Sequence, residues 1–252
     1  MTATSSSDRP FDDDPVLGRY LAHYVSDRRR LITQAGLAYA TGVIFIQLLF
    51  ADASEGLLPF VVIALFAALS LAAGWYVLHL WNREVVLYER GFTYREGSNL
   101  GVFHYAEIVS VRQQAERVRY LGFWRRDLYR YTLRSQHDET LRLDNLYQHI
   151  AELGLRLEKA ISAARLPVIE QRWAAGESID FGGGLRLRRE GIELNEGSGA
   201  RELFWHELGG HGLQGGRLVL RNRDGSDWAA VPLDALENLL LLLNLLKARA
   251  AS

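Results

Sequence analysis

Two long apolar runs lie near the start of the chain and dominate its pattern. Leu31–Phe50 has 20 positions without Asp, Glu, Lys, Arg or His, and Leu57–Trp81 has 25 positions with His79 as its one such residue. A helix crosses the hydrocarbon core of a bilayer with about 20 apolar residues. A helix of a soluble protein usually keeps a polar stripe, whereas Val61–Ala73 has Ser70 as its one polar residue. The pattern predicts a transmembrane helical hairpin over residues 31–82, with two buried helices of a soluble protein as the alternative.

Basic residues at the ends of the hairpin predict its orientation. Three arginines precede the first run and one follows the second, whereas the connecting residues 51–56 contain no Lys or Arg. Basic residues accumulate on the cytoplasmic side of membrane spans. We therefore expect a multi-pass protein of the cell (inner) membrane with both termini in the cytoplasm. The expected membrane-interface anchors are Arg28, Arg29, Arg30, Trp75, Tyr76, Trp81 and Arg83.

The residues before the hairpin fall into two segments. Residues 1–15 are rich in Ser, Thr and Asp, which predicts a disordered tail. Residues 16–30 carry apolar or aromatic side chains at helical spacing, among them Leu17, Tyr20 and Tyr24. This spacing predicts a juxtamembrane amphipathic helix. Its arginines either contact anionic headgroups or only set the topology of the hairpin.

After the hairpin, short strands followed by one helix are predicted twice. The first round is residues 83–166, the second is residues 177–252, and residues 167–176 are the expected linker. The strands expected in the first round are Glu84–Arg90, Phe92–Glu96, Val102–Val111, Leu128–Ser135 and Thr140–Leu143, before a helix over Leu146–Ala164. Those expected in the second are Ser178–Phe181, Leu185–Glu190, Ile192–Asn195, Leu203–Leu208, Arg217–Asn222 and Trp228–Pro232, before a helix over Leu233–Arg249.

The two rounds also match in sequence. Arg90–Gly97 lines up with Glu190–Gly197, and Phe103–Ile108 lines up with Leu203–Leu208 in the same register. Self-similarity at a fixed spacing is typical of duplicated structural units. We therefore expect two tandem units of similar fold.

The matching segments carry a resemblance to known proteins. Tyr105–Ile108 and Trp205–Leu208 each place an aromatic residue two positions before a glutamate, and an aliphatic residue follows. With the strand–Gly–strand turns and the closing helices, this resembles the pleckstrin-homology-like (PH-like) domains of bacterial membrane proteins. The order of two membrane spans followed by two PH-like units resembles the DUF6585 family, and the resemblance covers roughly Leu31–Arg249. The resemblance implies an α+β fold: an N-terminal two-helix transmembrane hairpin, then two PH-like units, each a curved antiparallel sheet capped by a C-terminal helix. It brings no catalytic residues.

The composition of the chain limits the partners and sites that we expect. The formal net charge is −1, which gives no reason to expect a nucleic-acid partner. The chain has no cysteine, so disulfides, thiolate nucleophiles, iron–sulfur clusters and cysteine-based zinc sites are excluded. We expect no cofactor.

Two motifs suggest catalysis at first sight. His206 and Glu207 are followed by His211, but a zincin needs its second histidine four residues after the first, on one face of a helix. Glu207 lines up with Glu107, which predicts a structural position at the end of a strand. Gly182–Gly184 lacks the Lys-Ser/Thr and the helix of a phosphate-binding loop, so it predicts a turn. We expect neither a metal site nor an enzyme.

A basic and aromatic segment, Arg117–Arg134, is the strongest candidate for an interaction surface. On a membrane-tethered domain its arginines are suited to anionic lipid headgroups or to an acidic protein partner. The alternative is a hairpin whose arginines are only solvated and whose aromatic residues pack in the sheet. The candidate lipid- or partner-binding residues are Arg117, Arg119, Phe123, Trp124, Arg125, Arg126 and Arg130.

These observations favour a membrane protein whose cytoplasmic PH-like tandem binds or scaffolds other molecules, without catalytic activity. A structural subunit of a membrane complex is the first alternative. A membrane-surface enzyme acting on lipid is the second. The oligomeric state is left open by the sequence.

Overall fold

The computed structural model of the protein describes residues 11–50, 57–120, 124–195, 197 and 199–250. It is a mixed α+β structure with two long apolar helices, several antiparallel sheets and a C-terminal helix. The chain forms two compact units, one of residues 1–103 with 146–148 and the other of residues 104–145 with 149–252.

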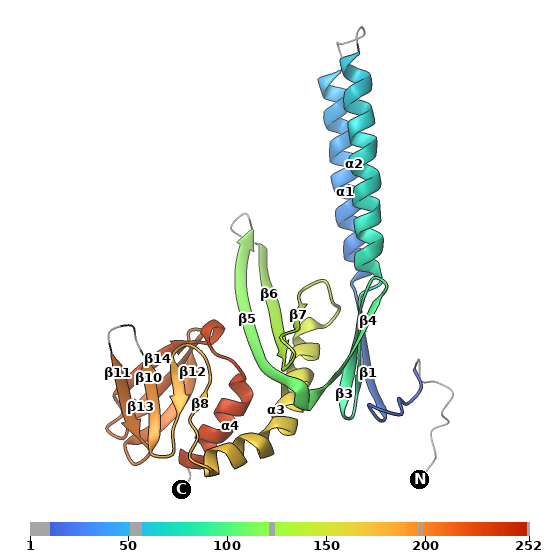
Figure 1. The fold of residues 1–252 in the computed structure, drawn as a ribbon. Coiled ribbons are helices and arrows are strands. Elements are labelled where there is room, and N and C mark those ends of the chain that lie inside the picture. Colours follow the sequence, from blue (N-terminus) through green and yellow to red (C-terminus); the bar gives the residue numbers. More distant parts are fainter. Residues whose placement is uncertain (1–10, 51–56, 121–123, 196, 198, 251–252) are drawn as a thin grey trace, which may run out of the picture. The chain divides into compact units, whose positions relative to one another are not determined.

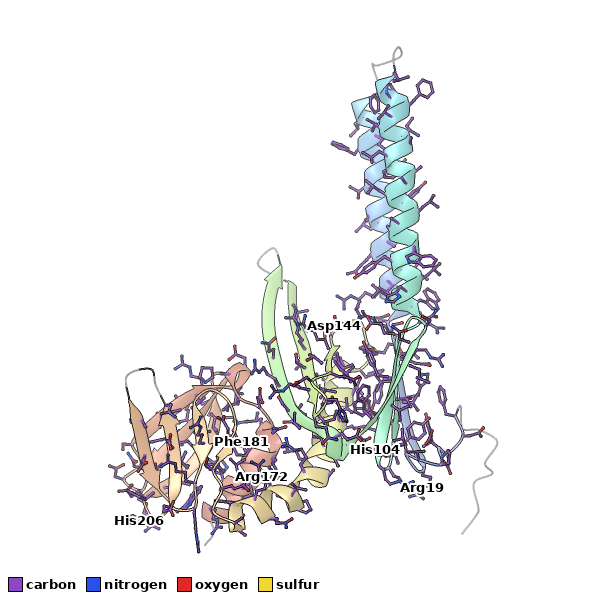
Figure 2. All side chains as sticks on the ribbon, viewed as in Figure 1. Arg19, His104, Asp144, Arg172, Phe181 and His206 are labelled. Carbon is purple, nitrogen blue, oxygen red and sulfur yellow. The ribbon has the colours of Figure 1, made fainter. Side chains whose placement is uncertain are left out.

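Two helices form the predicted hairpin in the first unit. Helices α1 (Arg28–Leu49) and α2 (Leu58–Trp81) lie side by side (Figure 1). Each contains a segment that is long and apolar enough to cross a membrane. Large apolar side chains project from the hairpin along its length (Figure 2), and those of Leu48 and Leu71 are 73% and 77% exposed. An apolar surface of this size is unfavourable in water and stable in lipid.

The predicted amphipathic helix over residues 16–30 is wrong. Tyr20–Val25 instead form strand β1, and helix α1 begins only at Arg28. Strand β1 pairs antiparallel with β2 (Glu84–Tyr88), which follows the hairpin in the sequence. Helical spacing in this short segment is therefore outweighed by pairing with a strand that is distant in sequence.

The hairpin is inserted between two paired strands of one sheet. The sheet has the order β1-β2-β3-β4, with β3 spanning Gly91–Glu96 and β4 spanning Asn99–His104. Ser26, which is fully buried, holds the base of the hairpin together. Its N–H donates to the carbonyl of Arg83 at 3.1 Å, and its hydroxyl donates to the carbonyl of Trp81 at 3.0 Å. The expected first round, residues 83–166, therefore has a further strand, β1, on the N-terminal side of the hairpin.

Residues 11–15, part of the predicted disordered tail, are ordered on this sheet. The Asp14 carboxylate accepts a hydrogen bond from the Leu17 N–H at 2.8 Å. Phe11 packs against a small cluster that contains Leu17 and Val86. This part of the prediction is wrong, and the remainder of the tail lies outside the described residues.

The second unit begins with a three-stranded sheet of order β5-β6-β7. Its strands β5 (Ile108–Tyr120) and β6 (Trp124–Ser135) form a long curved hairpin (Figure 1). Strand β7 (Thr140–Leu143) coincides with the predicted one. The predicted strand Val102–Val111 is interrupted by a short 3-10 helix, η2 (Tyr105–Glu107), at the start of this unit.

Helix α3 (Ile150–Ala174) replaces both the predicted helix and the linker. The helix continues through Pro167, so the predicted linker over residues 167–176 is wrong. Ile169 and Trp173, which lie beyond the proline, are only 2% and 6% exposed and belong to the large hydrophobic core of this unit. Their burial stabilises the helical turns that a proline disfavours.

The remaining elements surround that core. Two sheets, β8-β9-β10-β11 and β12-β13-β14, contribute to one hydrophobic cluster together with the buried leucines of helix α4 (Leu239–Ala250). The strands are β8 (Ile179–Asp180), β9 (Leu185–Leu187), β10 (Gly191–Asn195), β11 (Ala200–Phe204), β12 (Leu208–Gln214), β13 (Arg217–Asn222) and β14 (Asp227–Pro232). The glycine-rich β12 was not predicted. The short helix η3 (Leu233–Ala235) replaces the start of the predicted closing helix.

Glu107 and Glu207 occupy the same local geometry. The Glu107 carboxylate accepts a hydrogen bond from the His104 N–H at 3.3 Å, and that of Glu207 accepts one from the Phe204 N–H at 3.1 Å. In both cases the glutamate lies directly before a strand, β5 or β12. The predicted structural role of Glu207 at a strand end is confirmed.

Candidate anion-binding site

The β5-β6-β7 sheet has one apolar and one polar face because side chains alternate along each strand. Val111, Tyr131, Leu133 and Leu143 are 0–3% exposed and belong to the apolar face. The positions between them carry arginine, threonine, serine or glutamine. The sheet therefore buries one face and presents a dense row of polar groups on the other.

A hollow of about 610 Å³ lies on the polar face. Its lining contains four arginines, three hydroxyl residues, one glutamine and two carboxylates. The arginines are Arg112, Arg130, Arg134 and Arg142, and we call this site the arginine hollow.

Strand register brings these residues together. On β6, Thr132 pairs with Arg112 of β5 on one side and with Arg142 of β7 on the other. Residues directly opposite in an antiparallel pair have Cβ atoms about 4.5–5.5 Å apart. The three strands therefore place one arginine on each side of the Thr132 hydroxyl.

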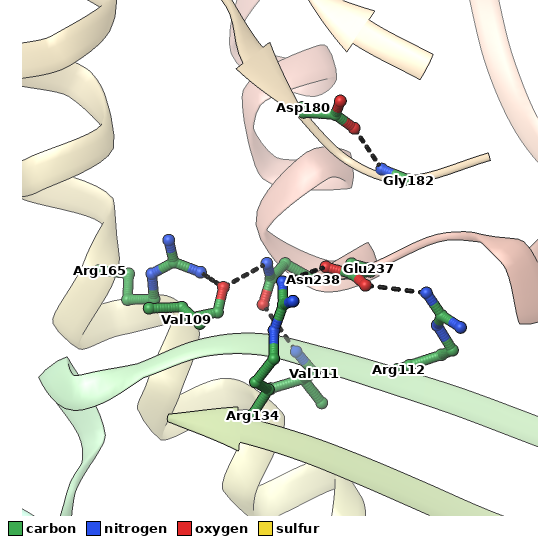
Figure 3. Close-up of polar contacts among 9 residues, drawn as sticks. All are labelled: Val109, Val111, Arg112, Arg134, Arg165, Asp180, Gly182, Glu237 and Asn238. Atoms are coloured by element: carbon green, nitrogen blue, oxygen red, sulfur yellow. Dashed lines mark hydrogen bonds and ion pairs between the residues drawn. The ribbon is translucent and has the colours of Figure 1, made fainter. Parts of the chain in front are cut away.

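Glu237 orients two of the arginines. Its carboxylate lies 2.8 Å from the Arg112 guanidinium and 3.8 Å from that of Arg134 (Figure 3). The Glu237 side chain is 21% exposed, so solvent screens these ion pairs less than fully exposed ones. Among the described residues, neither Arg130 nor Arg142 forms an ion pair with a carboxylate.

Asn238, the residue after Glu237, holds the backbone that carries the Glu237 carboxylate against strand β5. Asn238 is 7% exposed, and its backbone N–H donates to the Val111 carbonyl at 2.7 Å. Its side-chain oxygen accepts from the Val111 N–H at 3.1 Å, and its side-chain nitrogen donates to the Val109 carbonyl at 3.1 Å (Figure 3). Three hydrogen bonds thus attach the segment before α4 to strand β5.

Two ionisable side chains of α3, half-buried Arg165 and buried Glu158, contact the same region. The Arg165 guanidinium donates to the Val109 carbonyl, and burial lowers the pKa of Arg165. The Glu158 carboxylate accepts from the Leu240 N–H at 3.0 Å, at the first turn of α4. Burial raises the pKa of Glu158, and the hydrogen bond from Leu240 opposes that rise.

The predicted lipid- or partner-binding residues fall on the β5–β6 hairpin. Arg119 pairs with Arg125 in the backbone register. Arg130 lies in the arginine hollow and is exposed. Phe123 lies outside the described residues, as do the side chains of the other predicted residues, Arg117, Arg119, Trp124, Arg125 and Arg126.

The predicted interface anchors have different environments. Trp75 and Tyr76 are 78% and 61% exposed on α2. The Arg28 guanidinium lies 5.1 Å from the centre of the Trp81 ring, a cation–π distance. Arg83 forms an ion pair with Glu96 and its side chain is only 16% exposed, so it belongs to the folded base of the hairpin. Arg29 is exposed and Arg30 is half-buried, both in the first turn of α1.

Arg112 and Arg142 lie outside the predicted segment Arg117–Arg134, and Arg134, which ends that segment, was not among the named binding residues. A polar residue at every second position of β5, β6 and β7 was the available signal. The alternation marks a solvent-facing side of a sheet. It does not show which arginines become neighbours, because that depends on the register between strands.

The His206, Glu207 and His211 motif forms no metal site in the described part of the chain, where no group of three metal-ligating side chains occurs. His206 stacks on Phe204 with ring centres 5.7 Å apart. Burial lowers the pKa of His211. The motif therefore consists of separate side chains with local packing roles.

Comparison with known proteins identifies the family of the chain. A search of curated protein sequences finds no match. A family model described as a family of unknown function, DUF6585, matches residues 12–252. The match covers the hairpin, all the sheets and the closing helix, and the chain therefore belongs to the DUF6585 family.

Proposed function

We propose that this protein is an integral protein of the bacterial inner membrane whose cytoplasmic part is a binding or scaffolding module without catalytic activity. The observation that carries the proposal is the hairpin. Its two helices are long, apolar and exposed, and they are inserted between the paired strands β1 and β2. A membrane span joined to a sheet at both ends anchors that sheet at the membrane surface.

The cytoplasmic part is, in this proposal, a tandem of PH-like units. The order of elements supports it, since a four-stranded sheet, a three-stranded sheet and a helix follow one another twice along the chain. The second series has a shared hydrophobic core closed by α4. The equivalent hydrogen bonds of Glu107 and Glu207 also support a duplication. The module would bind anionic headgroups or a protein partner through the β5–β6 hairpin.

Single-cysteine labelling tests the topology, because the chain has no cysteine of its own. Ser54→Cys, between the two apolar runs, should react with a membrane-impermeant maleimide in spheroplasts. Lys159→Cys, at an exposed position of α3, should react only after the membrane is permeabilised. Labelling of Lys159→Cys in intact spheroplasts would refute the cytoplasmic location. Extraction of the protein by alkaline carbonate would refute the two membrane spans.

A further inference from the structure

The arginine hollow combines positive charge with hydroxyl groups in an alternating arrangement. Ser110 pairs with Arg134, and Arg134 pairs in turn with Thr140. Two residues further along β6, Thr132 lies between Arg112 and Arg142. Gln114 of β5 pairs with Arg130 of β6. Each arginine is therefore flanked by an uncharged polar group across the strand. This arrangement spaces the guanidinium groups and leaves room for an anion between them.

The charge of the hollow is not balanced by its own carboxylates. Four arginines face two acidic residues, Asp144 and Glu237. Glu237 is engaged with Arg112 and Arg134, which holds these two guanidinium groups in defined positions. Glu237 carries one negative charge, so its cluster with Arg112 and Arg134 keeps a net positive charge, and Arg130 and Arg142 form no ion pair among the described residues. A ligand with two negative charges would neutralise the site.

We propose that the arginine hollow binds a phosphomonoester dianion, with Arg130 and Arg142 as its main ligands and the Thr132 hydroxyl as a donor. Guanidinium groups form bidentate, charge-assisted hydrogen bonds with phosphate oxygens. A volume of about 610 Å³ is in the range of sites for small molecules and suits a headgroup-sized ligand rather than an extended polymer. The phosphate belongs either to a lipid headgroup or to a soluble phosphate ester. The inference rests on the proposed binding function and names the ligand chemistry.

The test uses the full chain in non-ionic detergent micelles and calorimetric titration with glycerol 3-phosphate, a soluble phosphomonoester. Sodium chloride at matched ionic strength is the reference. A second arm adds phosphatidate or phosphatidylglycerol to the micelles, which compares a monoester lipid headgroup with a diester one. Neither arm depends on the orientation of the membrane spans. An absence of phosphate binding can therefore be told apart from a failure of the proposed topology.

A double variant, Arg130→Gln with Arg142→Gln, removes the two arginines of the hollow that form no ion pair with a described carboxylate. Its matched control is Arg217→Gln with Arg223→Gln, which makes the same charge change at exposed positions of the β12-β13-β14 sheet and its turn. Since a hydrogen bond to a charged group contributes about 1.5–3 kcal/mol, the first double variant should lower the affinity for glycerol 3-phosphate at least about tenfold. The control should bind as the wild type does.

The outcomes separate the ligand sources. Binding of glycerol 3-phosphate alone would assign the site to soluble phosphate esters, and stronger binding in phosphatidate micelles would assign it to a lipid headgroup. The proposal is overturned if wild-type protein binds no phosphate more tightly than chloride. It is also overturned if both double variants lose affinity equally, or if phosphatidylglycerol binds as tightly as phosphatidate.

Discussion

The side chain of Asn238 accepts a hydrogen bond from the N–H of Val111 at 3.1 Å, although 127 residues separate them in the sequence. The backbone of Asn238 bonds to the same residue, so the segment before α4 continues the hydrogen bonding of strand β5. Asn238 has a positive φ of 53°, a left-handed conformation that asparagine tolerates better than most residues. The position thus requires both this backbone conformation and an amide side chain.

Replacing Asn238 should separate these two requirements. Asn238→Gly keeps access to the positive φ and loses the side-chain hydrogen bonds, which should lower the free energy of unfolding by about 1–3 kcal/mol. Asn238→Ala also strains the backbone and should cost about 1 kcal/mol more. Urea unfolding of the full chain in detergent, followed by tryptophan fluorescence, measures both. Equal stabilities of the two variants would contradict the role of backbone conformation.

Gly154 on α3 should not tolerate alanine, although alanine normally stabilises a helix interior by about 1 kcal/mol relative to glycine. A Cβ atom at position 154 would lie 2.0 Å from Cζ of the Tyr131 ring, which is itself buried in the core. Gly154→Ala should therefore destabilise the protein by about 1–3 kcal/mol through overpacking. Thermal unfolding of the variant measures the effect.

Gly74→Ala is the matched control, since a Cβ at that helical position meets no atom within 4 Å. It should leave the unfolding temperature unchanged or raise it. If Gly154→Ala also raised that temperature, close packing of Tyr131 against α3 would be refuted.

The buried carboxyl of Glu158 should make stability depend on pH. Burial raises its pKa above the ordinary value of 4.5, so the folded state holds the proton more tightly than the unfolded state does. The stabilising contribution of protonation is complete below pH 4.5 and is lost as pH rises through the folded-state pKa. Glu158→Gln keeps an oxygen that accepts from the Leu240 N–H and cannot ionise.

The stability of Glu158→Gln relative to wild type should therefore increase as pH rises from about 4.5 through the folded-state pKa of Glu158. Urea unfolding midpoints of both proteins across this range test the prediction, because contributions of other carboxyl groups cancel in the difference. A difference that stays constant over the range would show that Glu158 has the same pKa in both states.

Glu107 and Glu207 should contribute similarly to stability, because each carboxylate satisfies a backbone N–H three residues earlier. Glu107→Ala and Glu207→Ala should each lower the free energy of unfolding by about 1 kcal/mol. Glu139→Ala, at an exposed turn position, should have no effect. Chemical unfolding of the three variants compares them. A loss of stability in only one of the two glutamate variants would argue against equivalent roles.

The position and nature of the hairpin were determined by the sequence alone. Uncharged runs as long as Leu31–Phe50 and Leu57–Trp81 match the length of a helix that crosses a bilayer, and a helix satisfies its backbone polar groups within the segment itself. The strand Thr140–Leu143 and the strand-end role of Glu207 were also evident from local pattern and repetition. In each case the information lies within a few consecutive residues.

Tertiary structure decided the elements and sites that depend on contacts between residues far apart in the sequence. Tyr20–Val25 became a strand because β2 pairs with it across the whole hairpin, and α3 continued through Pro167 because Ile169 and Trp173 are buried. The arginine hollow exists only because strand register aligns Arg112 with Thr132 and Arg142. Local sequence specifies which residues are polar and how they alternate. The contacts between strands, which involve residues far apart in sequence, specify which of those residues meet.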